Sequence, residues 1–279
     1  MTTGVTAPRG FRAAGVRAGI KDDDLDLALL VADRTCAAAG VFTTSRTAAP
    51  PVAVAREHLA SGQARAVVVN SGCANAATGP SGLADAGEMA DLAAQVAGCT
   101  PGEVVVASTG VIGVRLPMDR VRSGIAQAGR ELSPEGGADA ARAIMTTDTK
   151  PKEASTEVSL GGVTCRVGGM AKGAGMIAPN MATMLAFFTT DATIDSRRLH
   201  RALVAAVGES LNRITVDGDT STNDCAVILA SGAAGAPPIE REGPDDEAFQ
   251  AALTTVARRL AETVSYTHLT LPTTLCMWS

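Results

Sequence analysis

The segment at residues 172–187, KGAGMIAPNMATMLAF, constrains the fold of this chain more than any other part of the sequence. Gly173 and Gly175 can adopt backbone angles that are closed to other residues, and Pro179 fixes its own φ angle. The apolar run after Thr183 predicts a buried strand, so we expect the chain to bend sharply just before this threonine. A strained peptide bond before a hydroxyl residue suits self-cleavage, because the hydroxyl oxygen can attack the preceding carbonyl carbon and form an ester that water opens.

Self-cleavage before Thr183 would leave this residue with a free α-amine. The reference pKa of such an amine is roughly 7.7 to 8.0, so near neutral pH it can accept the proton of the threonine hydroxyl. The hydroxyl oxygen then becomes a nucleophile whose base belongs to the same residue. The alternative is an ordinary threonine at the start of a core strand, which is the usual meaning of an isolated Ala-Thr pair.

The stretch K-G-A-G-M-I-A-P-N-M-A-T-M-L resembles the processing-site motif of the ornithine acetyltransferase family, also known as the glutamate N-acetyltransferases of arginine biosynthesis. The resemblance implies cleavage between Ala182 and Thr183 into alpha and beta chains that stay associated as a heterotetramer with two copies of each. It also implies an αββα sandwich in which Thr183 carries an acetyl group from N-acetylornithine to glutamate. No cofactor is expected, and the sequence leaves open whether acetyl-CoA is a second acetyl donor.

This resemblance divides the chain into three parts: an alpha chain at residues 1–182, the first part of a beta chain at 183–264, and a tail at 265–279. The tail contains the only Tyr and the only Trp of the chain, and a helical pattern breaks off just before it. We therefore expect the tail to be non-native sequence; the alternative is a genuine C-terminal strand. Family members also carry a glutamate, an asparagine and a threonine that line the substrate pocket from their C-terminal part, and this sequence has no counterpart for them.

The motif S-T-G-V-I-G at residues 108–113 supplies the predicted oxyanion hole. Acyl transfer creates a negatively charged oxygen, which needs hydrogen-bond donors held where that charge develops. The hydroxyl of Thr109 and the backbone N–H of Gly110 can converge at the end of a strand, and the resemblance assigns them this role. The alternative is a simple turn after a strand.

Two further residues are predicted to bind substrate. Lys172 is the only cation of the processing segment, so it is a natural partner for the carboxylate of an amino acid, although a surface lysine is the alternative. Thr146 matches another substrate contact of the family, with Thr147 as the neighbour that a shift of one position would select. The loop that contains Asn70, Cys73 and Asn75 is expected to support the site rather than to react, since nothing nearby would activate the thiol.

Charge and composition argue against several other classes of protein. The formal net charge is −5 and the basic residues are scattered, which disfavours a nucleic-acid-binding surface. Pro8 and Arg9 interrupt any secretory signal, and no apolar run reaches membrane-spanning length, so we expect a cytoplasmic protein without a membrane partner. The six cysteines include no C-x-x-C pair and there are only three histidines, so no metal site is expected.

Buried apolar runs alternate with amphipathic segments along the chain, which indicates an α/β or α+β architecture. The expected strands lie at residues 27–31, 40–42, 52–55, 66–69, 104–106, 156–160, 163–167, 184–188 and 226–230. Helices are expected to begin near Ser81, Pro117 and Asp195, and a fourth contains Phe249 and Leu260.

Two readings compete with the acetyltransferase. The first is an N-terminal-nucleophile aminopeptidase of related architecture, which also cleaves itself but transfers the acyl group to water. The second is an inactive, truncated fragment that keeps the motifs without completing the pocket.

Overall fold

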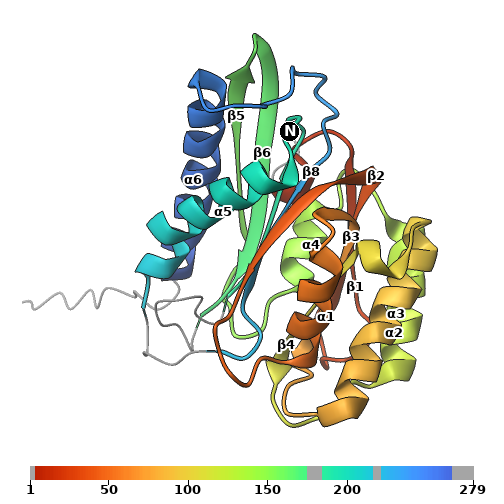
Figure 1. The fold of residues 1–279 in the computed structure, drawn as a ribbon. Helices are drawn as coiled ribbons and strands as arrows, with labels where there is room; N and C mark the ends of the chain where they lie inside the picture. The colour runs from red at the N-terminus through yellow and green to blue at the C-terminus, as the bar shows by residue number, and fades with distance from the viewer. Residues whose placement is uncertain (1–3, 175–183, 216–220, 266–279) are drawn as a thin grey trace, which may run out of the picture.

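The computed structural model describes residues 4–174, 184–215 and 221–265, and these residues form a mixed α/β structure (Figure 1). The strands are β1 (Phe11–Val16), β2 (Leu27–Phe42), β3 (Gln63–Cys73), β4 (Val104–Val111), β5 (Lys152–Leu160), β6 (Val163–Lys172), β7 (Leu185–Thr190) and β8 (Cys225–Ala230). The α-helices are α1 (Pro50–Leu59), α2 (Gly79–Ala97), α3 (Met118–Glu131), α4 (Gly137–Ala143), α5 (Ser196–Glu209) and α6 (Pro244–Ser265). The strands pair in the order β4-β3-β2-β8-β7-β6-β5, and β1 pairs with β2 outside this path.

The long strand β2 connects the two halves of the sheet. Its pairing with β3 shifts register between Val31 and Cys36, and an irregularity of this kind bends a strand. The part of β2 before the shift pairs with β1, and the part after the shift pairs with β8. As a result, β7 and β8, which come late in the chain, lie between β2 and β6, which come before the predicted cleavage site.

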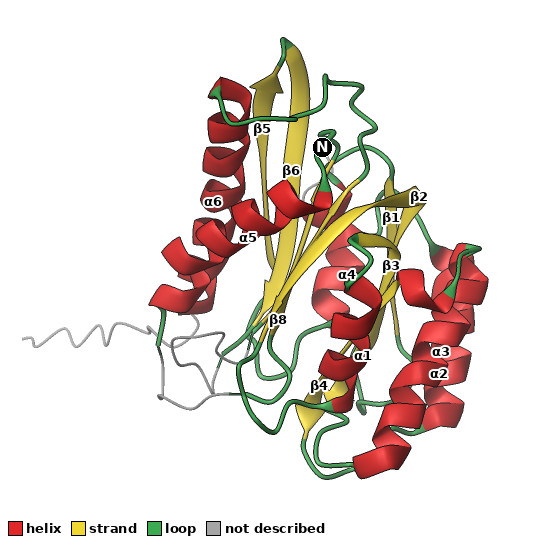
Figure 2. Ribbon diagram, viewed as in Figure 1, coloured by secondary structure: helices red, strands yellow, loops and turns green. Residues whose placement is uncertain are grey.

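Helices cover the outer faces of the sheet on both sides (Figure 2). On one side α5 and α6 pack against β6, β7 and β8, where Phe188 shares a buried cluster with Leu253. On the other side α2 and α3 pack against β2, β3 and β4, where Val68 shares a cluster with Met89. The opposite strand faces, such as the one that bears Phe187, form a central core with α4. The predicted αββα sandwich is confirmed.

Most of the predicted strands form, with wider bounds. The runs at residues 66–69, 104–106 and 226–230 lie within β3, β4 and β8, because continuous runs of valine, isoleucine and leucine suit strands that are buried on both faces. The run after Thr183 becomes β7, which is buried along its whole length. The expected hairpin is β5 and β6, and both glycines of its turn, Gly161 and Gly162, have positive φ angles.

One strand prediction is wrong, and two details of the helices differ. Residues 52–55 belong to helix α1, because Pro50 and Pro51 occupy its first turn, where the missing backbone N–H costs nothing. Ser81 lies inside α2, which begins at Gly79. The short helix α4 was not predicted at all.

The start of helix α5 agrees with the sequence. Asp195 caps α5 by accepting hydrogen bonds from the backbone N–H groups of Arg197 and Arg198, at 2.9 and 3.1 Å. Helix α6 spans Pro244–Ser265 and reaches the last residue that the structure describes. The remainder of the predicted tail lies outside the described residues. Within the described ranges, no helix combines the length and the apolar character that a bilayer span needs.

Candidate active site

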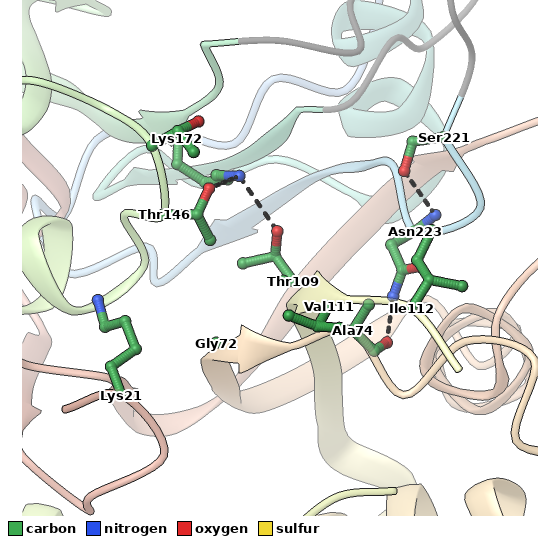
Figure 3. A pocket seen from close by; sticks show the side chains of 12 residues that line it. Lys21, Gly72, Ala74, Thr109, Val111, Ile112, Thr146, Lys172, Ser221 and Asn223 are labelled. Atoms are coloured by element: carbon green, nitrogen blue, oxygen red, sulfur yellow. Dashed lines mark hydrogen bonds between the residues drawn. The ribbon is translucent and has the colours of Figure 1, made fainter. Parts of the chain in front are cut away.

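The ends of β3, β4 and β6, together with neighbouring loops, line a cavity of about 540 Å³ at one edge of the sheet. Lys172 at the end of β6 pairs with Leu185 at the start of β7, and Leu185 pairs in turn with Cys225 at the start of β8. The ends of β3 and β4 lie beside each other in a parallel pair. Figure 3 shows side chains from β3, β4 and β6 and from neighbouring loops around the cavity. Its lining consists of Lys21, Gly72, Ala74, Thr109, Gly110, Val111, Ile112, Thr146, Thr147, Lys172, Ser221 and Asn223.

Three of the predicted site residues contact one another in this cavity. The ammonium of Lys172 donates hydrogen bonds to the hydroxyl oxygens of Thr109, at 3.1 Å, and of Thr146, at 2.6 Å (Figure 3). Thr147 also lines the cavity, but Thr146 is the threonine that Lys172 contacts. Lys172 is only 4% exposed, so it is not the surface lysine of the alternative reading. Residues from three separate motifs therefore converge on a single buried cation.

A buried ion pair between Asp148 and Lys152 fixes the backbone next to Lys172 and at Thr146. Asp148 accepts hydrogen bonds from the backbone N–H groups of Gly173, at 2.8 Å, and Thr146, at 3.1 Å, and it also pairs with the ammonium of Lys152. Both side chains of the pair are fully buried. Burial raises the pKa of Asp148, but its hydrogen bonds with Lys152 and Gly173 outweigh this effect and hold the pKa below its usual value.

Burial also changes the acidity of Lys172. Removal of the ammonium from water lowers the pKa of Lys172, and the nearby carboxylate of Asp148 opposes this shift. A buried ammonium that keeps its charge interacts strongly with the carboxylate of a ligand, because no solvent screens the pair. The arrangement suits recognition of a carboxylate in the cavity.

The predicted oxyanion residues lie in the last part of β4, which runs on to Val111. Gly110 has a φ angle of +133° and faces Gly72 across the β3–β4 pair. A Cβ atom on Gly110 would lie 2.3 Å from the carbonyl carbon of Gly72, so a side chain is excluded here. This close approach brings the backbone of Gly110 to the wall of the cavity, next to the hydroxyl of Thr109.

The end of β3 and the loop after it contribute structure rather than an activated nucleophile. Asn70 donates a hydrogen bond to the carbonyl oxygen of Cys73, at 2.8 Å, and Asn75 donates one to that of Gly82, at 2.8 Å. Asn75 and Ala77 have φ angles of +48° and +58°, a region that costs energy for residues other than glycine. Burial raises the pKa of the Cys73 thiol, which disfavours the reactive thiolate.

Two buried residues at the start of β8 join the site, and sequence reasoning missed both. Asn223 donates hydrogen bonds from its side-chain amide to the carbonyl oxygens of Ala74, at 2.7 Å, and Ser108, at 3.0 Å. Asp224 accepts a 3.0 Å hydrogen bond from the backbone N–H of Met184. Burial raises the pKa of Asp224 to about 8. Its second carboxyl oxygen has no hydrogen-bond partner among the described residues.

Lys21 brings a second cation to the wall of the cavity. Its ammonium donates a 2.9 Å hydrogen bond to the carbonyl oxygen of Met145, and its backbone N–H donates one to Asp26, at 2.9 Å. Gly72 makes room for it, because a Cβ atom there would lie 2.9 Å from the Cγ atom of Lys21. Burial lowers the pKa of Lys21, although the neighbouring carboxylates, chiefly Asp24, oppose the shift. No sequence motif had indicated this residue.

The predicted nucleophile and cleavage site, Thr183 and Ala182, lie outside the described residues. The structure does describe Met184, which directly follows Thr183 in the sequence. The N–H group of Met184 is bound to Asp224, and its carbonyl oxygen accepts a hydrogen bond from the N–H of Cys225 at 3.2 Å. The residue next to Thr183 is therefore held at the same edge of the sheet as the cavity.

Comparison with known sequences identifies the family. The chain matches the ArgJ family over residues 12–266. It is 55% identical to the arginine biosynthesis bifunctional protein ArgJ of Symbiobacterium thermophilum over 265 residues, which are 94% of this chain and 66% of that protein. The protein of the same name from Synechococcus sp. is 50% identical over 94% of this chain and 64% of its own length. The chain thus spans slightly less than two thirds of these relatives.

Solved structures agree with this assignment. The arginine biosynthesis bifunctional protein argJ of Bacillus halodurans is 41% identical with a TM-score of 0.61, over 64% of this chain and 94% of that chain. Ornithine acetyltransferase of Mycobacterium tuberculosis, solved with ornithine, is 46% identical with a TM-score of 0.57, over 63% and 95%. An L-aminopeptidase D-Ala-esterase/amidase of Ochrobactrum anthropi has a TM-score of 0.58 over 94% of this chain and 85% of that chain; at 12% identity it shares only the fold.

Proposed function

Because this chain belongs to the ArgJ family, we propose that it transfers an acetyl group from N-acetylornithine to glutamate through an ester on Thr183. The observation that carries the proposal is the position of Lys172, bonded to Thr109 and Thr146 inside a cavity beside the start of β7. A buried cation next to oxyanion donors suits a reaction in which an amino acid must be held by its carboxylate while its amine reacts. Ornithine in the solved Mycobacterium tuberculosis relative supports this substrate class.

In the first half of the proposed reaction, the hydroxyl oxygen of Thr183 attacks the acetyl carbon of N-acetylornithine. The α-amine of Thr183 accepts the hydroxyl proton and passes it to the nitrogen of ornithine as the C–N bond breaks. The hydroxyl of Thr109 and the N–H of Gly110 stabilise the negative oxygen that forms in between. In the second half, the amine of glutamate attacks the ester, the C–O bond breaks, and the proton returns to the oxygen of Thr183.

The charge of the cavity supports an acidic acceptor. Glutamate has two carboxylates, and the cavity wall carries two ammonium groups, those of Lys172 and Lys21. In this scheme the acetyl group needs no cofactor, and acetyl-CoA would be a second donor to the same nucleophile. We place the reaction in the cytoplasm.

We also propose that the chain is cut between Ala182 and Thr183 and that the products remain together in an assembly of two alpha and two beta chains. The coverage of the solved relatives supports the cut. Their chains are matched almost completely by 63% to 64% of this chain. Residues 1–182 are about 65% of the 279 residues, so a chain that ends near Ala182 has this length.

The test is to trap the acetylated enzyme. A full-length protein that contains this sequence is mixed with N-acetylornithine, without acceptor, and digested for mass spectrometry. We expect one acetyl group on the peptide that begins at Thr183, and its loss after glutamate is added. An acetyl group on Cys73, or none under single-turnover conditions, would contradict the mechanism. Release of acetate to water at the rate of glutamate acetylation would favour the aminopeptidase-like alternative.

A further inference from the structure

We propose that Asn223 and Asp224 form a positioning element, here called the 223–224 clamp, which holds the oxyanion donors and Met184, the residue that follows Thr183, at a fixed separation. The inference rests on the proposed function, since it assigns the clamp to the same site. It adds two residues that act through the backbone on either side of the cavity.

Asn223 fixes the backbone that carries the proposed oxyanion donors. Its amide group reaches the carbonyl oxygens of Ala74, just after β3, and Ser108, within β4, so that one side chain ties the two strand ends together. The carbonyl of Ser108 belongs to the planar peptide unit that ends at the Cα atom of Thr109. A hydrogen bond to this carbonyl therefore fixes the backbone from which the Thr109 hydroxyl and the Gly110 N–H project.

The orientation of the Asn223 amide is itself fixed. The hydroxyl of Thr222 donates a 2.6 Å hydrogen bond to the amide oxygen of Asn223, which leaves the NH₂ group directed at the two strand carbonyls. Asn223 is 7% exposed, so water does not compete for these contacts. The amide thus has a defined partner for its oxygen and for both of its N–H groups.

Asp224 fixes the backbone of Met184, the residue that follows the proposed nucleophile. Its carboxyl oxygen accepts the N–H of Met184, and this N–H belongs to the peptide unit that joins Met184 to Thr183. Asp224 is 1% exposed and precedes Cys225, whose own N–H binds the carbonyl oxygen of Met184. Met184 is therefore held through both of its backbone groups by two consecutive residues.

The clamp works because its two residues are neighbours. One short stretch just before β8 therefore reaches β3 and β4 through the side chain of Asn223 and reaches Met184, next to β7, through the side chain of Asp224. The two held groups are then linked through two adjacent residues rather than only through the whole sheet. Small errors in such a distance are costly, since a misplacement of about 1 Å can slow a reaction about 100-fold.

The first experiment tests Asn223 in the full-length protein. Asn223→Ala removes the amide, and Asn223→Asp keeps the shape but removes the NH₂ donors. We expect both variants to lower kcat about 10- to 100-fold while KM for N-acetylornithine stays within about threefold. In a Thr109→Ala background, the same changes at Asn223 should cost clearly less than in the native protein, because one of the two groups they position is already gone. Additive effects in this double-mutant cycle would overturn the role of Asn223.

The second experiment tests Asp224 by rescue. Asp224→Asn keeps an oxygen that can accept the N–H of Met184, whereas Asp224→Ala does not. We expect the alanine variant to lose about tenfold or more in kcat and the asparagine variant to stay within about threefold of the native protein. Hydrogen exchange of the Met184 amide, followed by mass spectrometry, should accelerate in the alanine variant alone. Equal exchange and equal kcat in all three proteins would overturn the role of Asp224.

A matched control separates positioning from general stability. Ser231 follows the far end of β8 and is also buried, and its hydroxyl donates a 2.7 Å hydrogen bond to the carbonyl oxygen of Arg9. Ser231→Ala should lower Tm without changing kcat; if it slows transfer as much as the clamp variants do at an equal loss of Tm, the clamp is only structural. A native protein that makes no acetyl-Thr183 would instead refute the proposed function, and the exchange measurement would still test the contact of Asp224.

Discussion

Lys172 donates a 3.1 Å hydrogen bond to the hydroxyl oxygen of Thr109, although the two residues lie 63 positions apart in the sequence. A threonine hydroxyl has one hydrogen to donate, and this contact leaves that hydrogen available for another acceptor. Donation from an ammonium also polarises the hydroxyl and makes it a stronger donor. In the proposed reaction, the residue that binds the carboxylate of the substrate therefore also strengthens the oxyanion hole.

Removal of the Thr109 hydroxyl should slow acetyl transfer more than it weakens binding. Loss of one oxyanion donor typically costs about 2.7 to 4 kcal/mol, so Thr109→Ala should lower kcat on the order of 100- to 1000-fold. Thr109→Ser keeps the hydroxyl and is the matched control, with an expected loss below about tenfold. Steady-state kinetics with N-acetylornithine and glutamate would check this. Unchanged turnover in the alanine variant would exclude Thr109 from the oxyanion hole.

Removal of the charge at Lys172 should affect both binding and turnover. A hydrogen bond to a charged group is worth about 1.5 to 3 kcal/mol, so Lys172→Met should lower kcat/KM for glutamate about 10- to 100-fold. Because burial lowers the pKa of Lys172, its charge is lost earlier than usual as pH rises, and KM for glutamate should increase in alkaline solution. The methionine variant should lack this pH dependence. The exposed Lys150 provides a control, and an equal effect of Lys150→Met would contradict the assignment.

The sequence predicted the elements that depend on local pattern. The strand after Thr183 and the strands at residues 66–69 and 104–106 are continuous apolar runs, and such runs have few other places in a folded protein. The strand predicted at residues 52–55 is wrong because Val-Ala-Val after Pro50 and Pro51 also fits the alternation of a strand. Proline in the first turn of a helix was the signal that could have corrected this prediction.

The site was only partly predictable. Thr109, Thr146 and Lys172 lie in recognisable motifs, and the fold brings them together. Asn223 and Asp224 end a further motif of the family, but the sequence does not predict their roles, since their partners are backbone groups that are distant in the sequence. Such contacts depend on strand order and register, which local patterns do not specify.

Cleavage should depend on the hydroxyl of Thr183. The native chain is expected to yield two fragments, of residues 1–182 and of residues from 183 onward, on a denaturing gel and by intact mass. Thr183→Ala removes the attacking oxygen and should leave a single uncut chain. Thr189, a buried threonine of β7, is the matched control, and Thr189→Ala should still be cut. Efficient cleavage of the Ala182–Thr183 bond in the Thr183→Ala variant would disprove self-processing by this residue.

Loss of Asp148 should destabilise the whole chain. Its side chain and that of Lys152 are fully buried, and removal of one partner from a buried pair typically costs about 3 to 5 kcal/mol because the other charge remains unpaired. Asp148→Asn should lower the free energy of unfolding by about this amount in urea denaturation. Asp119, which pairs with Arg122 at the surface, is the control and should change stability by less than about 1 kcal/mol. Similar losses of unfolding free energy for the Asp148 and Asp119 variants would contradict a larger contribution from the buried pair.

Asp224 should make stability depend on pH. Its folded-state pKa of about 8 lies above its unfolded value of about 3.9, so the folded chain retains a proton that the unfolded chain releases. This contribution to stability is complete below about pH 4 and is lost as pH rises through about 8. Asp224→Asn does not titrate, so its stability relative to the native protein should increase over this range. Denaturation curves at several pH values would measure the difference, and parallel curves would contradict the shift.

The place of β7 and β8 between β2 and β6 determines what a cut at residue 182 would do to the folding reaction. The intact chain can fold in a single-molecule process, with every strand present on one polymer. After the cut, the fragment that carries β7 and β8 would have to bind between β2 and β6 of a separate fragment. Refolding would then be a second-order process, which slows on dilution. Folding would have to be complete before the cut, and the mature enzyme would persist because it unfolds slowly, not because it can easily re-form.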